Sequence, residues 1–278
     1  MNYAEYEPSE CLRPFVRCYW SLQSGHEASV APDVKGVPEP ALPDGSPEFI
    51  INAADPFCVV SHGGAIVQQP RAILVGQITR ALSVAPTGRV DLFAVRFRPH
   101  GAALVSDDLA AITDDWIHAD RLPVDGLDAI ADVFELDREP SERRAVFDAF
   151  LGALLRTRRM PDPEVQAAVQ AIEDSHGMIA LDQLAATVGC SLRHLQRQFA
   201  KQVGIAPKLL ARIRRFQRVF SAWRDDPRSL SRVAAECGYF DQPHLIRDFR
   251  DFAGQAPAAF LANQPELTQF FLSTAPQR

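Results

Sequence analysis

Two stretches near the end of the chain carry polar side chains whose types and spacing suit contact with nucleic-acid bases and phosphates. Arginine recognises guanine with two parallel hydrogen bonds, and glutamine recognises adenine in the same way. Lysine and histidine can add contacts to phosphate oxygens. The side chains are Arg193, His194, Gln196, Arg197 and Lys201 in the first stretch, and Gln242, His244 and Arg247 in the second.

The two stretches belong to an internal repeat. Residues 184–199 match residues 233–249, and both copies contain the pattern His-Leu-x-Arg-x-Phe. Both copies finish with Gly-x-Ala-Pro. Two copies are too few for a solenoid, which needs at least about three repeats. The repeat therefore predicts two related units that bind DNA.

The second copy predicts two helices joined by a turn. Gly238 closes the first helix, and Asp241 can accept the free N–H groups that begin the second. At about 100° per residue, Leu245 and Phe249 share one face of that second helix, whereas Arg247 points away from it. A helix-turn-helix presents its recognition helix in this way.

The segment between the two units predicts one long amphipathic helix that ends near Asp225. Its apolar residues recur every three or four positions, and arginines fill much of the remainder. Such a helix of about 17 residues spans roughly 25 Å. Two recognition helices on successive turns of DNA need roughly 34 Å between them. The length of the connecting helix is of the same order as this separation. The apolar residues are Leu209, Ile213, Phe216, Phe220 and Trp223.

This pair of motifs with its connecting helix resembles the DNA-binding domain of AraC/XylS-type bacterial transcription regulators, over roughly Asp174 to Gln264. The sequence departs from the family pattern at Pro243, where a small polar residue is usual, and at Asn263, which replaces an arginine. The resemblance implies binding to the major groove of double-stranded promoter DNA, with RNA polymerase as a partner and activation rather than repression. It implies base contacts from Arg193, Gln196 and Arg197 in the first unit and from Gln242, His244 and Arg247 in the second.

Charge along the chain supports this interpretation. The 278 residues carry a net charge of −6. Residues 176–263 nevertheless contain thirteen basic and seven acidic residues, a local charge of +6 that leaves −12 elsewhere. A basic module on an acidic body is typical of proteins that bind DNA phosphates. Asp248 and Asp251 offset Arg247 and Arg250, so we expect the first unit to supply most of the electrostatic affinity.

The composition and the first residues favour a cytoplasmic protein without a membrane segment. Hydrophobic residues make up 47% of the chain and charged residues 23%, which is ordinary for a globular protein. No stretch approaches 18 consecutive apolar residues, and the acidic start lacks the pattern of a secretory signal. Five dispersed cysteines suit a reducing compartment better than a disulfide framework.

The chain before the repeat predicts an α+β domain, in which short strands, forming a small barrel-like sheet, precede helices. We expect a sensing or dimerisation domain over residues 1–160, the paired helix-turn-helix domain over 161–264, and a tail over 265–278. The expected strands are Phe15–Leu22, Glu48–Asn52, Cys58–Ser61, Ala72–Val75 and Val90–Arg98. The expected helices are Asp107–Ile112, Leu127–Phe134, Ser141–Leu155, with Ser141 as its cap, and Pro163–Ile172.

This front region also resembles an uncharacterised N-terminal domain that often precedes AraC-type pairs. The resemblance covers most of residues 10–155 and departs from the pattern at His100, where a small residue is usual. It implies that the front domain senses a small-molecule effector or mediates homodimerisation. The matching motifs are Leu42-Pro43-Asp44-Gly45 with Glu48, Val75-Gly76-Gln77, and Val95 to Pro99 with Gly101-Ala102.

Four residues of the front region are candidate effector contacts. Arg96 and Arg98 alternate with apolar residues, so one strand face would be buried and the other would carry two guanidiniums. These could bind a carboxylate or phosphate, or they could form a solvated strand face or an internal ion pair. Trp20 and Trp116 could pack in the core or stack on a ligand. The histidines His26, His62, His100 and His118 lack metal-ligand spacing, and we expect no metal or cofactor.

Three classes of function remain open at this point. The leading one is a sequence-specific transcription regulator. A second is a co-regulator whose front domain binds another protein. A third is an enzyme such as a DNA-repair methyltransferase, which needs an activated cysteine. Neither Cys11 nor Cys18 lies in the Pro-Cys setting of such enzymes, so we expect no enzymatic activity.

Overall fold

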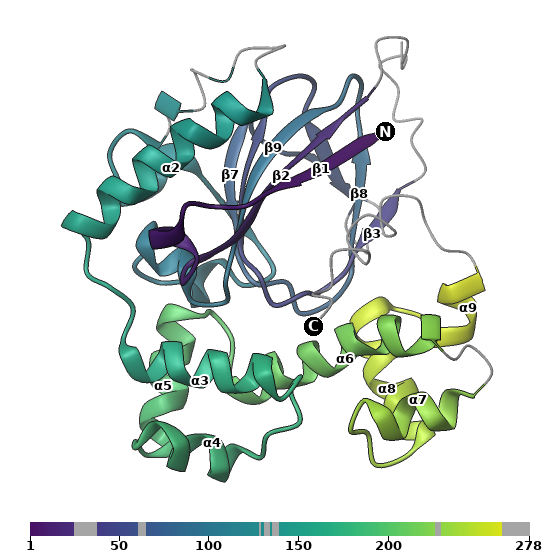
Figure 1. Ribbon diagram of the computed structural model, residues 1–278. Helices are drawn as coiled ribbons and strands as arrows, with labels where there is room; N and C mark the ends of the chain where they lie inside the picture. The colour runs from purple at the N-terminus through teal and green to yellow at the C-terminus, as the bar shows by residue number, and fades with distance from the viewer. Residues whose placement is uncertain are drawn as a thin grey trace.

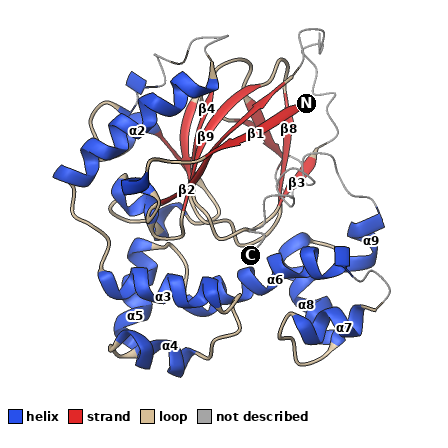
Figure 2. Ribbon diagram, in the orientation of Figure 1, coloured by secondary structure: helices blue, strands red, loops and turns tan. Residues whose placement is uncertain are grey.

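The chain folds into a front part of strands and short helices and a back part of α-helices, which touch each other (Figures 1 and 2). The fold class is the one expected from the sequence. We call the segment from β1 to α2 the front part and the segment from α3 to α9 the back part. The computed structural model describes residues 1–24, 38–60, 65–127, 129–130, 134, 139–225 and 229–262.

Six strands of the front part form one antiparallel sheet in the order β1-β2-β9-β4-β7-β10. Tyr19, Phe93 and Phe147 stack on one face of this sheet, with ring centroids about 6 Å apart, and join it to helix α2 (Pro140–Thr157). The strands are β1 (Asn2–Tyr6), β2 (Val16–Gln23), β4 (Glu48–Asn52), β7 (Ala72–Val75), β9 (Asp91–Phe97) and β10 (Trp116–His118).

A second antiparallel sheet, in the order β3-β8-β5-β6, covers the other face of the first. Trp20 and Leu92 of the first sheet share an apolar cluster with Phe57 of the second. The described strands therefore form two separate sheets, and the expected barrel-like closure is wrong. The strands are β3 (Glu39–Ala41), β5 (Phe57–Val60), β6 (Ile66–Gln68) and β8 (Leu82–Pro86).

Strand β9 is buried along its whole length because a layer packs on each of its faces. The sequence predicted one buried face and one face carrying two guanidiniums. That prediction is wrong, since Arg96 is only 4% exposed and Arg98 lies beyond the end of the strand. The alternation of residues could not reveal that a second sheet lies over the arginine face.

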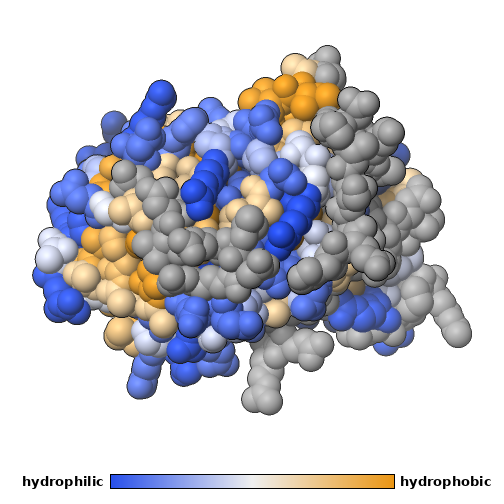
Figure 3. Space-filling view, turned by 90° about the horizontal axis from the view of Figure 1, so that it is seen from above, coloured by the Kyte–Doolittle hydropathy of each residue, from blue (hydrophilic) through white to orange (hydrophobic). Residues whose placement is uncertain are grey.

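At the edge of the second sheet, β6 exposes Ile66 and Val67. Seen from above, the surface is mostly hydrophilic with small hydrophobic areas (Figure 3). Small exposed apolar patches such as this neighbouring pair are common on globular proteins. This edge therefore does not by itself define an interface.

Helix α2 begins one residue earlier than expected, at Pro140 after Glu139, so Ser141 lies inside the helix and does not cap it. The Arg143 side chain is fully buried and donates two hydrogen bonds to Asp91, of 2.6 and 2.7 Å. This pair joins α2 to the first residue of β9. Residues 107–112 form only the 3-10 helix η3. The other 3-10 helices are η1 (Glu10–Leu12), η2 (Gly101–Leu104) and η4 (Ala119–Arg121), with η3 at Ala110–Ile112.

The back part consists of α-helices around an aromatic core. The centroid of the Phe216 ring lies 5.1 Å from the ring centroids of both Phe249 and Phe252. The Phe220 ring packs against that of Phe260. Half of the residues of the expected helix at 127–134 lie outside the described residues, as do the whole tail at 265–278 and Asn263, His26 and His62. The helices are α3 (Pro163–Asp174), α4 (Leu181–Val188), α5 (Leu192–Gln202), α6 (Pro207–Asp225), α7 (Leu230–Glu236), α8 (Gln242–Ala253) and α9 (Pro257–Ala262).

The two repeat units turn at equivalent glycines. Gly189 follows α4 with φ of 71°, and Gly238 follows α7 with φ of 73°. This left-handed conformation is readily adopted by glycine, and it ends a helix by satisfying its last carbonyl groups. The same backbone signal therefore precedes α5 and α8, as the repeat predicts.

Candidate functional site

Helix α5 presents three of the predicted base-contacting side chains to solvent. Ser191 caps the helix by accepting a 3.2 Å hydrogen bond from the backbone N–H of His194. Leu195 and Phe199 are fully buried and fix the opposite face against the back-part core. The side chains that remain exposed on the outer face are Arg193, Gln196 and Arg197.

Helix α8 repeats this arrangement in the second unit. Asp241 caps it by accepting a 2.7 Å hydrogen bond from the His244 N–H. Leu245 and Phe249 are buried, and Arg247 is exposed. The half-buried Gln242 accepts a 2.8 Å hydrogen bond from the Ser231 hydroxyl of α7.

The two equivalent histidines are half-buried and hold local structure. Nδ1 of His194 lies 3.2 Å from the guanidinium of Arg197. Nδ1 of His244 accepts a 3.4 Å hydrogen bond from the backbone N–H of Phe240, and its ring packs edge-on against Tyr239. These contacts orient an arginine in the first unit and the turn in the second.

The acidic residues of α8 point toward the connecting helix. Asp248 is buried and accepts a 2.7 Å hydrogen bond from Arg212 of α6, and Asp251 accepts another of 2.8 Å from the same side chain. In the charge balance of the sequence, these acids offset Arg247 and Arg250. In the structure they instead compensate a cation of α6.

Phe240 was missed by the sequence analysis. It lies in the turn directly before the Asp241 cap, and its side chain is 92% exposed. From sequence alone, a phenylalanine next to a tyrosine in a short turn is expected to be buried in the core. Nothing in the spacing distinguishes the exposed ring of Phe240 from the buried ring of Tyr239.

Backbone contacts of the front part reach the C-terminal ends of both α5 and α8. The N–H of Leu109 donates to the carbonyl of Lys201 at 3.0 Å. The Thr113 hydroxyl donates to the carbonyl of Gly204 at 2.7 Å, two residues after the end of α5. The N–H of Ala81 donates to the carbonyl of Phe252 in α8 at 2.7 Å. Lys201 is exposed, but it lies in the last turn of α5.

These contacts come from two loops that are joined to each other. Asp114 accepts two hydrogen bonds from Thr79, of 2.6 Å each, one from its N–H and one from its hydroxyl. The loop before Ala81 and the loop around Thr113 thus form one connected structure. This structure contacts both units of the back part, at the C-terminal ends of α5 and α8.

A second contact between the two parts centres on Glu173 of α3. Its carboxylate accepts hydrogen bonds of 2.7–2.8 Å from Arg17, Arg98 and Arg214. Burial alone would raise the pKa of Glu173, but the three guanidiniums outweigh burial and lower it. Arg98 therefore joins the two parts. Beside this contact, burial lowers the pKa of His100 to about 4.

The two sheets enclose a cavity that reaches the back part. Its volume is about 110 Å³, counted as space for the centres of water-sized molecules. Apolar side chains form most of its wall, and Gln217 of α6 contributes from the back part. Of the candidate effector contacts, Arg96 and Trp116 line it. Trp20 lies behind it and donates a 3.1 Å hydrogen bond to Glu48.

Arg96 is paired inside the cavity. Its Nε donates a 2.6 Å hydrogen bond to Glu48, and its NH1 lies 3.4 Å from a Glu5 carboxylate oxygen. Burial raises the pKa of Glu48. The arrangement matches the internal ion pair that the sequence left open as an alternative for Arg96.

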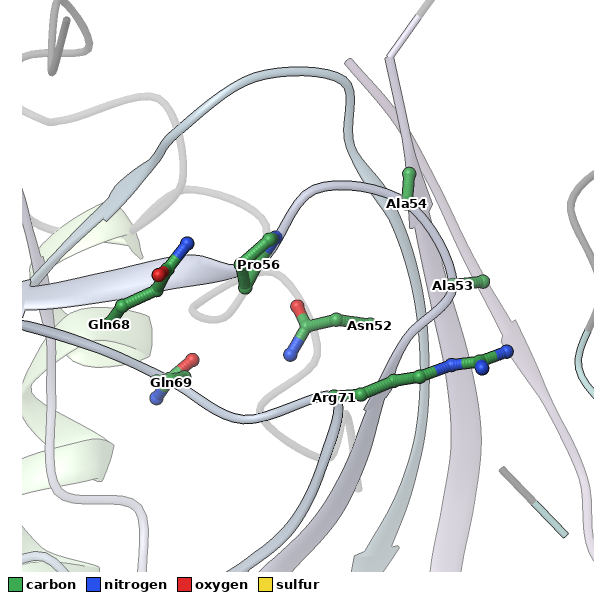
Figure 4. Close-up of a pocket in the computed structure, with 7 residues that line it drawn as sticks. All are labelled: Asn52, Ala53, Ala54, Pro56, Gln68, Gln69 and Arg71. Atoms are coloured by element: carbon green, nitrogen blue, oxygen red, sulfur yellow. The ribbon is translucent and has the colours of Figure 1, made fainter. Parts of the chain in front are cut away.

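A second hollow lies on the surface beside Asn52 and Arg71 (Figure 4). It is wide and open to solvent, and none of the predicted site residues lines it. Arg71 donates a 3.0 Å hydrogen bond to the carbonyl of Phe134, and the Asn52 amide donates one of 3.2 Å to the carbonyl of Pro70. Of its four polar lining side chains, Asn52 and Arg71 therefore hold backbone carbonyls.

The buried cysteines Cys18 and Cys237 lack the activation that a nucleophilic thiol requires. Burial raises the pKa of the Cys18 thiol to about 12, and likewise that of Cys237. A catalytic thiolate needs a lowered pKa. Within the described ranges there is no group of three or more potential metal ligands, and no helix there is long and apolar enough to cross a bilayer.

Two family models match the chain. Residues 184–263 match a model described as a helix-turn-helix domain, and residues 4–117 match one described as a domain of unknown function, DUF6597. The back part therefore carries a helix-turn-helix domain. The domain of unknown function lies in the front part, and the helix-turn-helix match lies in the back part.

Similar proteins include transcription regulators. Over 153 residues the chain is 28% identical to the HTH-type transcriptional regulator GbdR of Pseudomonas aeruginosa, covering 54% of this chain and 40% of GbdR. The match thus spans less than half of that relative. ToxT from Vibrio cholerae is similar in structure, with a TM-score of 0.47 and 9% identity over 94% of this chain and 99% of ToxT. The xylose-binding transcription activator xylR is another similar structure, with a TM-score of 0.32 and 18% sequence identity. The match covers 46% of this chain and 40% of xylR.

Proposed function

We propose that this protein is a sequence-specific DNA-binding transcription regulator whose front part responds to a small-molecule effector. The observation that carries the proposal is the pair of equivalent helices α5 and α8. Each has a capped start, a buried apolar face and exposed polar side chains. We call α5 and α8 the recognition helices from here on.

In the first unit, Arg193 and Arg197 would bind guanine edges or phosphates in the major groove, and Gln196 an adenine edge. In the second unit, Arg247 would contact a base and Gln242 would approach the groove from the helix start. His194 and His244 would orient neighbouring groups, and Lys201 would lie near phosphate.

Helix α6 suits the placement of two recognition helices on one side of DNA. Its 19 residues give a rod of about 28 Å. The apolar face of this rod lies in a core shared with both units, and Phe216 and Phe220 pack against Phe249 of the second unit. Successive major-groove segments lie roughly 34 Å apart. A rod of this length that packs in both units would keep their separation constant.

The front part would act through the loops that touch both recognition helices. Ile78 and Trp116 line the cavity. Ile78 lies in the loop that continues to Ala81, and Trp116 begins β10 shortly after Thr113. An effector in the cavity would therefore alter the contacts at the ends of α5 and α8. By family resemblance we expect activation and contact with RNA polymerase, and a homodimer would place two copies on one promoter.

The test begins with the full chain and a genomic fragment library. Purified protein should select a small set of fragments, and footprinting should show two protected segments about one helical turn apart. The Arg193→Ala, Arg197→Ala double variant should lose this selection, whereas Arg121→Ala, on an exposed site of the front part, should keep it. Selection without sequence preference, or equal loss in both variants, would contradict the proposal.

A further inference from the structure

The polar end of the cavity between the sheets carries more acidic than basic side chains. Asp44 and Glu48 line it, and Arg96 is the one basic residue among the lining residues described. Glu5 lies behind Arg96 and adds another carboxylate to the same cluster. A ligand anion placed here would meet an excess of negative charge.

Arg96 has little capacity left to bind an anion. Its guanidinium contacts the carboxylates of Glu48, Glu5 and Asp44, at 2.6, 3.4 and 3.7 Å. Its central carbon also lies 5.8 Å from the centre of the Trp20 ring. An incoming carboxylate or phosphate would have to displace one of these groups in a buried setting, where leaving a charge unpaired is costly. The geometry thus argues against the anion-binding role considered for Arg96.

Two hydrogen-bond acceptors in the same cavity have capacity to spare. Oδ1 of Asp44 accepts a 2.8 Å hydrogen bond from the Ser46 N–H, and its Oδ2 lies 3.7 Å from Arg96. The Ser46 side chain is only 7% exposed, and its hydroxyl has no hydrogen-bond partner. A buried hydroxyl without a partner is uncommon and costs free energy.

We propose that this cavity binds a protonated amine attached to an apolar body. The ammonium N–H groups would donate to the Asp44 carboxylate and the Ser46 hydroxyl, where charge-assisted hydrogen bonds are strongest. The apolar body would pack against Ile50, Val59 and Val84 from both sheets. The effector role of such a ligand rests on the regulatory function proposed above, but its binding does not.

The same loop also contacts the back part. The carbonyl of Asp44 accepts a 3.0 Å hydrogen bond from Arg214 of α6. The neighbouring carbonyl of Pro43 accepts one from Gln217, which lines the cavity. An amine bound at Asp44 would therefore change the position or rigidity of a loop that α6 holds directly.

The experiment compares three probes of equal chain length on the full-length protein, by calorimetry and thermal shift. They are hexylamine, hexan-1-ol and hexanoate. Hexylamine should bind about tenfold or more tightly than the other two. Asp44→Asn removes the charge but keeps an acceptor for the Ser46 N–H, and it should weaken hexylamine binding about tenfold. Ser46→Ala should weaken it less, and the exposed control Asp120→Asn should not change it.

The three probe affinities can be compared on the wild-type protein alone, so this part of the test does not depend on whether a variant folds. Hexanoate binding as tightly as hexylamine, or no probe binding, would overturn the proposal, as would hexylamine binding that Asp44→Asn leaves unchanged. DNA affinity measured in parallel separates the two proposals. Amine binding without any sequence-specific DNA binding would support the ligand site and contradict the regulatory function.

Discussion

The hydroxyl of Thr113 in the front part donates a 2.7 Å hydrogen bond to the carbonyl of Gly204, two residues after the end of the first recognition helix. Thr113→Val keeps the side-chain shape but removes this bond, which we expect to weaken the local contact by about 1 kcal/mol. Hydrogen exchange of the amides at residues 203–205 should then accelerate roughly fivefold. Thr187→Val, which removes an exposed bond within α4, is the control. Unchanged exchange after Thr113→Val would show that this bond does not hold the helix end.

The two recognition helices should differ in their electrostatic contribution. Arg197→Ala should cost about 1–3 kcal/mol at its base pair and reduce the slope of log affinity against log salt by about one. Arg247→Ala should reduce the slope less, because fewer basic residues surround it on the outer face of α8. Salt titrations on the same operator measure both, with Arg121→Ala as the control. Equal slopes for the two variants would contradict the asymmetry.

Glu173→Gln should loosen the contact between the front and back parts. Three guanidiniums would lose their shared carboxylate at a site that is only about one-tenth exposed. We expect a loss of about 3 kcal/mol in the free energy of unfolding, measured by denaturant titration. Glu164→Gln, at an exposed site of the same helix, is the control. A loss below about 0.5 kcal/mol would argue against this contact.

The same carboxylate predicts a pH dependence. The pKa of Glu173 is lower in the folded protein than its ordinary value, so its contribution is fully present above that ordinary value. It is lost progressively as the pH falls through the lower folded pKa. Melting temperatures measured from pH 6 down to about pH 3 should therefore fall less steeply for Glu173→Gln than for the wild type. Parallel curves for the two proteins would contradict the shift.

Phe240 should affect DNA recognition but not stability. Its side chain is 92% exposed, so Phe240→Ser should change the free energy of unfolding by less than about 0.5 kcal/mol. A phenylalanine at the start of a recognition helix can contact the methyl group of thymine. Replacing one operator thymine by uracil should weaken wild-type binding by about 1 kcal/mol but leave Phe240→Ser unaffected. Ile66→Ser serves as control, and identical uracil effects in both proteins would exclude the contact.

The back part could be predicted closely because its signals are local. The repeat, the glycine turns and the Asp241 cap each depend on residues near one another in sequence. They appear in the structure at the predicted positions, with Leu245, Phe249 and Phe252 buried. The strands Glu48–Asn52 and Ala72–Val75 were predicted residue for residue.

The front part was predicted less well because its structure depends on distant pairings. The short strands β3, β6 and β10 contain three residues each, too few for a periodic pattern to show. The second sheet hides one face of β9, and the partners of Arg96 and Arg98 come from separate elements. The contacts of Asp248 with Arg212 likewise join residues 36 positions apart. Periodic patterns within one sequence do not indicate which residues pair when those residues lie far apart along the chain.

The continuous helix α6 restricts how the spacing of the two units could change in evolution. One residue inserted into its middle would rotate the second unit by about 100° relative to the first and advance it by about 1.5 Å. The recognition helices would then no longer face the same side of the duplex, and the loops ending at Ala81 and Thr113 would no longer reach both. Binding-site spacing should therefore be nearly invariant among descendants of this chain, while the bases at each half-site remain free to diverge.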